Sequence, residues 1–323
     1  MESLSRAANS TKTADGRRSH KSFISFMQRA IERKTFLGKT GTARNYRATL
    51  RSFEKFSNGR EVPLKGITQG VIEEYEAWLG RTTISSNSVS FYMRNMRAMY
   101  NRAVEARLTV DRAPFKKAYT RIEKTSKRAI TLADIKRIKE VDLSAHPALD
   151  LARDTFMFLF YCRGMSFIDA AHLTRDHISG NELRYRRHKT GQQIRIGLND
   201  YITGLIAKWH TLVPDNCYLL PIIHFPYARD YNRCKPERTL YESALRRTNK
   251  ALKKIARIAA IPTTLTTYVT RHSWASIAKS KGIPTATISD ALGHDSELTT
   301  QIYLASLSSD AIDRANSFIL SDL

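Results

Sequence analysis

Cysteine is scarce in this sequence, with three residues among 323. Cys162, Cys217 and Cys234 stand far apart, without a C-x-x-C pair and without histidines at a zinc-ligand spacing. Neither a disulfide framework nor a zinc site is supported, so we expect no metal and a reducing cytoplasm as the compartment.

Long apolar runs are also missing. The N-terminal segment MESLSRAANSTKTADGRRSHK contains no hydrophobic stretch typical of a signal peptide. No later segment approaches the roughly 18 uncharged apolar residues of a transmembrane helix. These absences predict a soluble, cytoplasmic protein without a membrane partner.

Acidic residues are too few to balance the basic ones. The chain has 30 Asp+Glu against 53 Lys+Arg, a formal net charge of +23. An excess of this size points to a polyanionic partner, and nucleic acid is the foremost candidate. We therefore expect the protein to be associated with the nucleoid. Composition alone leaves open a ribosome-associated protein, or a basic protein whose charge serves only solubility.

The length of the chain suits two domains with separate cores. Residues 1–20 are small, polar and basic, which predicts a disordered arm. Helical periodicity predicts a first domain at 21–112. The basic segment 113–127 contains Pro114 and no apolar period, so it is interpreted as a linker along nucleic acid, and 128–323 is the second domain.

Two helices of the first domain combine an apolar stripe with a basic face. Tyr46, Leu50 and Phe53 recur at i, i+4 and i+7, and a second stripe runs through 89–104. Arginines lie on the other faces of both helices. Their repetition predicts phosphate contacts, whereas each arginine alone fits an ordinary solvated surface. The candidate DNA-binding residues here are Arg44, Arg47, Arg51, Arg94 and Arg97.

The second domain is expected to be mainly helical with a small β-sheet, an α+β arrangement. An apolar stretch at 149–160 predicts a buried helix. The segments ELRYRRHK and QIRIGL flank a Thr-Gly turn, which predicts a β-hairpin with Lys189 at its turn. Arg186 and Arg187 on this hairpin are further candidates for DNA contact.

A guanidinium, an imidazole and a phenol follow one another on successive predicted helices near the C-terminus, in Arg271, His294 and Tyr303. Attack on a phosphodiester needs a nucleophile, a positive charge at the non-bridging oxygens and a proton for the leaving oxygen. Tyr303 can be the nucleophile, Arg271 can bind phosphate through two donors, and His294 can handle a proton. Each residue alone has a structural alternative, but together in a basic chain they favour DNA strand cleavage.

The segment TTYVTRHSWASIAKSKGIPTATISDALGHDSELTTQIYL resembles the signature of the tyrosine recombinases, or phage integrase family: H-x-x-R-H, then L-G-H, then a tyrosine nine residues on. The resemblance covers nearly the whole chain. It implies a helical SAM-like core-binding domain at 21–112 and a catalytic domain at 128–323. The implied function is site-specific recombination of the kind performed by mobile-element integrases and DNA invertases.

The family pattern also implies a lysine on a hairpin turn that acts as general acid, a place that Lys189 fills. The family's first arginine, set in T-G-L-R-x-S-E-L, aligns with the uncharged Ser166 in R-G-M-S-F-I-D-A. Arg163 lies three residues earlier. In a helical segment it would share a face with Ser166 and could take over the role of the family's first arginine. The alternative for Arg163 is a surface ion pair. Tyr268 replaces the family's first histidine, and its hydroxyl can still donate one hydrogen bond to a phosphate.

The reaction implied by the resemblance is transesterification through a 3′-phosphotyrosine at Tyr303, without ATP or another cofactor. Double-stranded DNA at specific recombination sites is the implied partner, and two rounds of strand exchange imply a homotetramer on two paired sites. The apolar residues of the terminal segment 304–323 predict a helix that docks on a neighbouring protomer or packs on its own domain.

Two other functions stay open on the sequence. Ser166 and Tyr268 favour a DNA-binding protein of the same fold that is catalytically impaired. A type IB topoisomerase-like strand transferase would use the same nucleophile without strand exchange.

Overall fold

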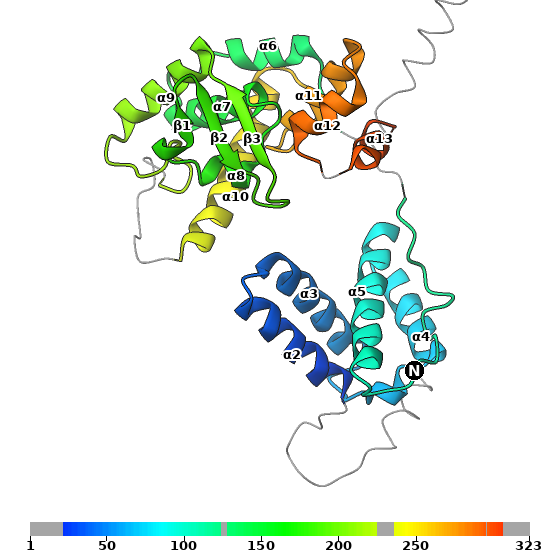
Figure 1. The fold of residues 1–323 in the computed structure, drawn as a ribbon. Coiled ribbons are helices and arrows are strands. Elements are labelled where there is room, and N and C mark those ends of the chain that lie inside the picture. Colours follow the sequence, from blue (N-terminus) through cyan, green and yellow to red (C-terminus); the bar gives the residue numbers. More distant parts are fainter. Residues whose placement is uncertain (1–21, 124–127, 225–235, 295, 306–323) are drawn as a thin grey trace, which may run out of the picture. The chain divides into compact units, whose positions relative to one another are not determined.

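The computed structural model describes residues 22–123, 128–224, 236–294 and 296–305. The chain divides into two compact units, Met1–Lys124 and Thr125–Leu323 (Figure 1). Each unit has its own apolar core. The arm expected at 1–20 lies outside the described residues, as does the part after residue 305 of the docking segment expected at 304–323.

The first unit is helical. Hydroxyl side chains set three of its helix starts, because Ser22, Thr68 and Ser85 each accept a hydrogen bond from the backbone N–H three residues on. Its elements are α2 (Phe23–Phe36), α3 (Thr40–Phe56), the 3-10 helix η2 (Leu64–Gly66), α4 (Gln69–Gly80) and α5 (Ser86–Glu105).

Aromatic rings fill the centre of this unit. Phe53 is 0% exposed and meets the rings of Phe23 and Tyr75 edge-on, with centroids 5.7 and 5.3 Å apart. The expected stripe on α3 is confirmed, since Tyr46 and Leu50 are buried beside Phe53. The stripe of α5 is buried in the same core.

The segment 113–127 differs from the linker expected there. Phe115 is buried in the core of the first unit. Tyr119 N–H donates to Glu76 Oε2 at 3.1 Å, and Asn87 exchanges two hydrogen bonds with the backbone of Glu123. One buried aromatic ring and these polar contacts therefore attach residues up to 123 to the first unit, which apolar periodicity alone did not reveal.

The second unit is mainly helical with a three-stranded antiparallel sheet in the order β1-β2-β3, as expected. Before the sheet come α6 (Leu132–Glu140), α7 (Pro147–Tyr161), α8 (Phe167–Ala171) and the 3-10 helix η3 (Arg175–His177). The strands are β1 (Ile178–Ser179), β2 (Glu182–Arg186) and β3 (Gln193–Gly197). After it come α9 (Asp200–Leu212), α10 (Glu237–Ile258), α11 (Val269–Ser280), α12 (Thr285–Leu292) and α13 (Glu297–Ala305).

Helix α7 is the centre of the second unit. Phe158 and Leu159 pack in a cluster with the inward residues of β2 and β3, while Phe156 and Met157 pack in a second cluster with α6 and α10. All four side chains are 0% exposed. The predicted hairpin is confirmed, with Arg186 opposite Gln193 at the last paired position before the loop. The loop 187–192 therefore projects from a sheet that rests on the central helix.

Replacing Phe53 with alanine should destabilise the first unit by about 3–5 kcal/mol, because the change leaves a cavity among fixed aromatic rings. Denaturant unfolding of the full chain, followed by circular dichroism, measures this as an earlier first transition. Phe36 on α2 is 90% exposed, so Phe36→Ala is the matched control and should change stability by less than about 0.5 kcal/mol. Equal losses in both variants would contradict the assigned core.

Candidate active site

Arg271 is the most enclosed charge of the candidate site. It lies in the first turn of α11 and is 3% exposed. Its Nη1 donates to the carbonyl of Gly164 at 3.1 Å, and its Nη2 donates to the carbonyl of Leu292. Nη2 also lies 3.1 Å from Nε2 of His294. The guanidinium thus connects the start of α11 to two other segments, the turn after α7 and the end of α12.

Gly164 permits this approach. Its φ of +70° is left-handed, and a Cβ placed there would lie 2.6 Å from Cα of Arg271. A side chain at this position would collide with backbone, so a glycine is required. The turn after α7 and the start of α11 are in direct contact for this reason.

His294 is held from both ring nitrogens. Helix α12 ends at Gly293, whose φ of 63° forms a left-handed cap, and His294 follows it. Its Nδ1 lies 2.7 Å from Oγ1 of Thr300 on α13. An arginine can only donate, so Nε2 accepts from Arg271 and Nδ1–H donates to Thr300. Tyr303 lies on the same helix, three residues after Thr300.

The loop of the β2–β3 hairpin reaches the Gly293 cap. Arg187 at the start of the loop is 8% exposed, and its Nη1 donates to the Gly293 carbonyl. A Cβ on Gly293 would lie 3.1 Å from Cδ of Arg187. Arg186 and Lys189 are exposed. The structure therefore places one hairpin arginine, Arg187, beside the Gly293 cap. The sequence had predicted this residue only as a DNA contact.

Asp169 ties the hairpin loop to α8. Ser166 caps α8, and its Oγ donates to Oδ2 of Asp169 at 2.6 Å. The other carboxylate oxygen accepts from the backbone N–H of His188 at 2.8 Å. Asp169 is 6% exposed. Sequence reasoning missed this link, although the aligned acid of the family pattern was a signal that pointed to it.

The segment between α7 and α8 is not helical. Arg163 follows the end of α7 with a φ of 58°, and Ser166 starts a new helix. The shared helical face expected for Arg163 and Ser166 is therefore absent, because the chain turns between them. The backbone of Arg163 directly precedes Gly164, whose carbonyl binds Arg271.

Tyr268 lies at the N-cap of α11 and is 53% exposed. Its ring meets that of His272 edge-on, with centroids 4.7 Å apart. Tyr268 and Ser166 line a common cavity of about 370 Å³ beside α10. The two residues that depart from the family pattern thus lie at one hollow next to the Arg271 segment.

Electrostatics connect these groups through Tyr185 on β2. Burial raises the pKa of the Tyr185 phenol, and the Asp169 carboxylate raises it further, whereas Arg271 and Arg187 lower it. The phenol therefore lies within reach of all three charges. Hydrogen bonds place Arg271 and Arg187 at Leu292 and Gly293, and they place Asp169 at the hairpin loop beside Arg187.

The arginines predicted on the first unit lie on α3 and α5. Arg44, Arg47, Arg51 and Arg97 are exposed. Arg94 is half-buried, and its Nε donates to the Ser90 carbonyl at 3.3 Å.

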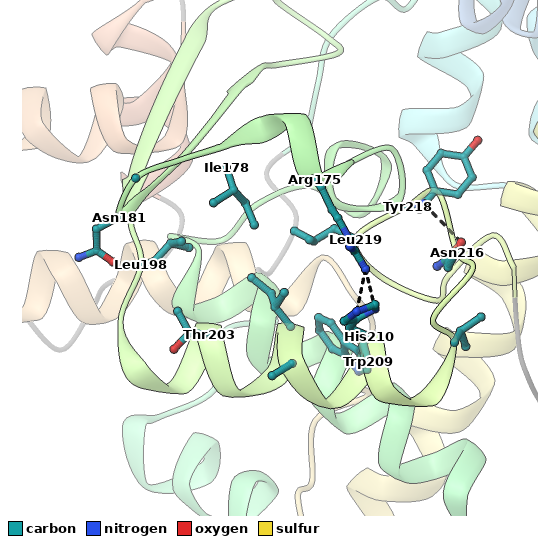
Figure 2. Close-up of a pocket in the computed structure, with 14 residues that line it drawn as sticks. Arg175, Ile178, Asn181, Leu198, Thr203, Trp209, His210, Asn216, Tyr218 and Leu219 are labelled. Atoms are coloured by element: carbon teal, nitrogen blue, oxygen red, sulfur yellow. Dashed lines mark hydrogen bonds between the residues drawn. The ribbon is translucent and has the colours of Figure 1, made fainter.

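A separate pocket of about 530 Å³ lies between the β1 edge and α9 (Figure 2). Arg175 and His210 contact one another at its rim, and Trp209 forms part of its lining. None of the predicted catalytic residues lines it.

Metal-ligand clusters and membrane-spanning helices can be assessed only for the described residues. Within them, no cluster of three or more His, Cys, Asp and Glu side chains has a metal-binding arrangement. Across the same part of the chain, no helix combines the length and apolar character needed to cross a membrane.

Solved structures share the fold. A lambda integrase fragment, a dimer bound to a COC′ core site, is 14% identical, with a TM-score of 0.65 over 88% of this chain and 96% of that chain. The Tn1549 transposon integrase with transposon right end DNA is 14% identical, with a TM-score of 0.63 over 93% and 99%. A lambda integrase tetramer on a Holliday junction is 16% identical, with a TM-score of 0.60 over 88% and 84%.

Sequence comparison identifies the family directly. No curated protein sequence is similar enough to match this chain. Residues 22–122 match the phage integrase SAM-like domain, and residues 128–309 match the phage integrase family. The second match covers more than half of the chain and contains Arg271, His294 and Tyr303. The chain therefore belongs to the phage integrase family, the tyrosine-type site-specific DNA recombinases.

Proposed function

We propose that this recombinase cleaves and rejoins DNA with Tyr303 as nucleophile and Arg271, His294 and Lys189 as its partners. The observation that carries the proposal is the partly buried contact between Arg271 Nη2 and His294 Nε2, 3.1 Å apart, because His294 lies on the segment that leads into the helix of Tyr303. A phosphate bound there would meet a fixed guanidinium and an imidazole together.

The first chemical step is a transesterification. The Tyr303 oxygen forms a bond to phosphorus, and the bond from phosphorus to the 5′ oxygen breaks. When Arg271 turns a donor to the phosphate, Nε2 of His294 is released and accepts the phenol proton. Lys189 on the exposed hairpin loop gives a proton to the leaving 5′ oxygen. The product is a 3′-phosphotyrosine and a free 5′ hydroxyl.

Rejoining reverses the same step. A 5′ hydroxyl from a partner duplex attacks the phosphotyrosine and regenerates the phenol. Phosphodiester energy is conserved, so the balance needs neither ATP nor another cofactor. Tyr268 is proposed to donate one hydrogen bond to the phosphate from the start of α11.

Strand exchange between two sites is proposed to use a homotetramer on paired double-stranded sites. The lambda integrase dimer on a core site and its tetramer on a Holliday junction support this assembly. We propose that the SAM-like unit and the catalytic unit both bind DNA, and that the protein acts on nucleoid DNA in the cytoplasm.

Two alternatives use the same fold. A catalytically impaired DNA-binding protein is favoured by Ser166, whose hydroxyl is bonded to Asp169 and brings no charge to the site. A topoisomerase-like enzyme would relax supercoiled DNA that contains no recombination site. Covalent capture and relaxation assays separate these alternatives from a recombinase.

Tyr303→Phe should bind DNA normally and form no covalent adduct, because the variant lacks the nucleophilic oxygen. The probe is a library of duplexes with randomised cores and a nick that lets the cleaved fragment diffuse away. Adducts are isolated on denaturing gels, and the captured cores are sequenced. Tyr268→Phe should still form the adduct, at a reduced rate. An adduct from Tyr303→Phe but not from Tyr268→Phe would reverse the assignment. If the unmodified protein formed no adduct, the catalytically impaired DNA-binding protein would be the better description.

Lys189→Ala should slow cleavage by about 10²–10⁴-fold, the range for losing a general acid. A captured core duplex with sulfur in place of the 5′-bridging oxygen tests the role, because a thiolate leaves without a proton. The variant should cleave this duplex nearly as fast as the unmodified protein does. Equal defects on both duplexes would show that Lys189 does not protonate the leaving oxygen.

Replacing Arg44, Arg47, Arg94 and Arg97 together with alanine should reduce the slope of log affinity against log salt by about 3–4, since each phosphate contact releases close to one counterion. Fluorescence anisotropy over a salt series measures the slope. Arg238→Ala is the control and should change the slope by less than about one, because Glu242 already pairs with Arg238. An unchanged slope in the quadruple variant would place the phosphate contacts elsewhere.

A further inference from the structure

The site lacks a charge at Ser166. The Ser166 hydroxyl donates to Asp169, whose other oxygen accepts from the hairpin backbone. A neutral hydroxyl engaged in this way cannot offset the negative charge that grows on the phosphate during attack. Losing one preorganised charge of this kind costs about 10²–10³ in rate, so an active enzyme needs another cation.

Arg187 is a buried cation in the hairpin loop. It is 8% exposed, and the described residues contain no carboxylate within ion-pair distance of it. Its Nη1 bonds the Gly293 carbonyl, whereas Nε and Nη2 have no hydrogen-bond partner among the described residues. Neither of these two nitrogens is fully hidden from solvent. Burying an unpaired charge is costly, and two adjacent guanidinium donors match the geometry of a phosphate.

Arg187 and Arg271 donate hydrogen bonds to consecutive backbone carbonyls. Arg271 bonds the carbonyl of Leu292, and Arg187 bonds the next carbonyl, that of Gly293. Each guanidinium group therefore donates a hydrogen bond to one of the two residues that directly precede His294. The guanidinium of Arg187 therefore lies at the peptide segment that leads directly into His294, next to the carbonyl that Arg271 binds.

The loop that holds Arg187 is itself fixed. The backbone N–H of Arg187 donates to the Gln192 carbonyl at 2.8 Å, and Gly191 N–H donates to the Arg187 carbonyl at 2.8 Å. Asp169 holds His188, the next residue. The same short loop carries Lys189. One hydrogen-bonded turn thus carries both the proposed general acid, Lys189, and Arg187.

We propose that Arg187 supplies the positive charge that Ser166 lacks, by binding a non-bridging oxygen of the scissile phosphate beside Arg271. This rests on the proposed cleavage reaction and names a further catalytic residue for it. Arg163, the candidate from the sequence, has no shared helical face with Ser166 and is the rival in the test.

The test compares two captured core duplexes, one natural and one with a methylphosphonate at the scissile linkage, where a methyl group replaces a charged oxygen. Arg187→Ala should cleave the natural duplex about 10²–10³-fold more slowly than the unmodified protein. On the neutral linkage, which needs less compensating charge, its deficit should shrink at least about tenfold. Arg187→Lys should fall between, because it keeps the charge without the paired donors.

Controls separate charge from structure. Arg184 lies on β2 of the same hairpin, is exposed and pairs with Glu182, so Arg184→Ala should cleave both duplexes at nearly the unmodified rate. Circular dichroism and DNA affinity establish that each variant folds and binds. A deficit of Arg187→Ala that is equal on both duplexes would overturn the proposal and leave Arg187 as a support for Gly293.

The remaining outcomes are also decisive. Rescue of Arg163→Ala by the neutral linkage, with none for Arg187→Ala, would give the role to Arg163 and overturn the proposal. Normal cleavage by Arg187→Ala beside an active unmodified protein would overturn the proposal and leave the proposed function intact. Absence of any adduct from the unmodified protein would overturn the proposed function and this inference with it.

Discussion

The candidate site depends on a buried guanidinium that is satisfied by backbone carbonyls. Arg271 bonds Gly164 on the turn after α7 and Leu292 at the end of α12. Each hydrogen bond to a charged group contributes about 1.5–3 kcal/mol. The two carbonyl oxygens hold the side chain in place and bring no negative charge of their own to the guanidinium.

Two glycines make this arrangement sterically feasible. Gly164 admits the backbone of Arg271, and Gly293 admits the hairpin side chains of Ile194 and Arg187. Both adopt left-handed backbone conformations, which side-chain-bearing residues rarely take. Close packing at these two positions brings the hairpin loop, the start of α11 and the end of α12 to one point. The site is thus a product of backbone contacts as much as of reactive side chains.

Asp169 shows how the site accommodates the serine at position 166. Its buried carboxylate has one neutral hydroxyl and one backbone N–H as partners. Each carboxylate oxygen thus has a hydrogen-bond donor, and the two bonds connect α8 to the loop of Lys189. The carboxylate therefore helps to fix the position of the loop.

The sequence by itself determined the family, the helical stripes and the hairpin, and it predicted Arg271, His294 and Tyr303 as site residues. These follow from local periodicity and from short motifs, where spacing along the chain reports geometry directly. Only the tertiary structure decided the place of Arg187, the attachment of Phe115 and the break between Arg163 and Ser166. Burial of a hairpin arginine depends on Gly293, 106 residues further along, and no local pattern encodes that contact. Likewise, the left-handed turn at Arg163 ends a helix that periodicity alone would have continued.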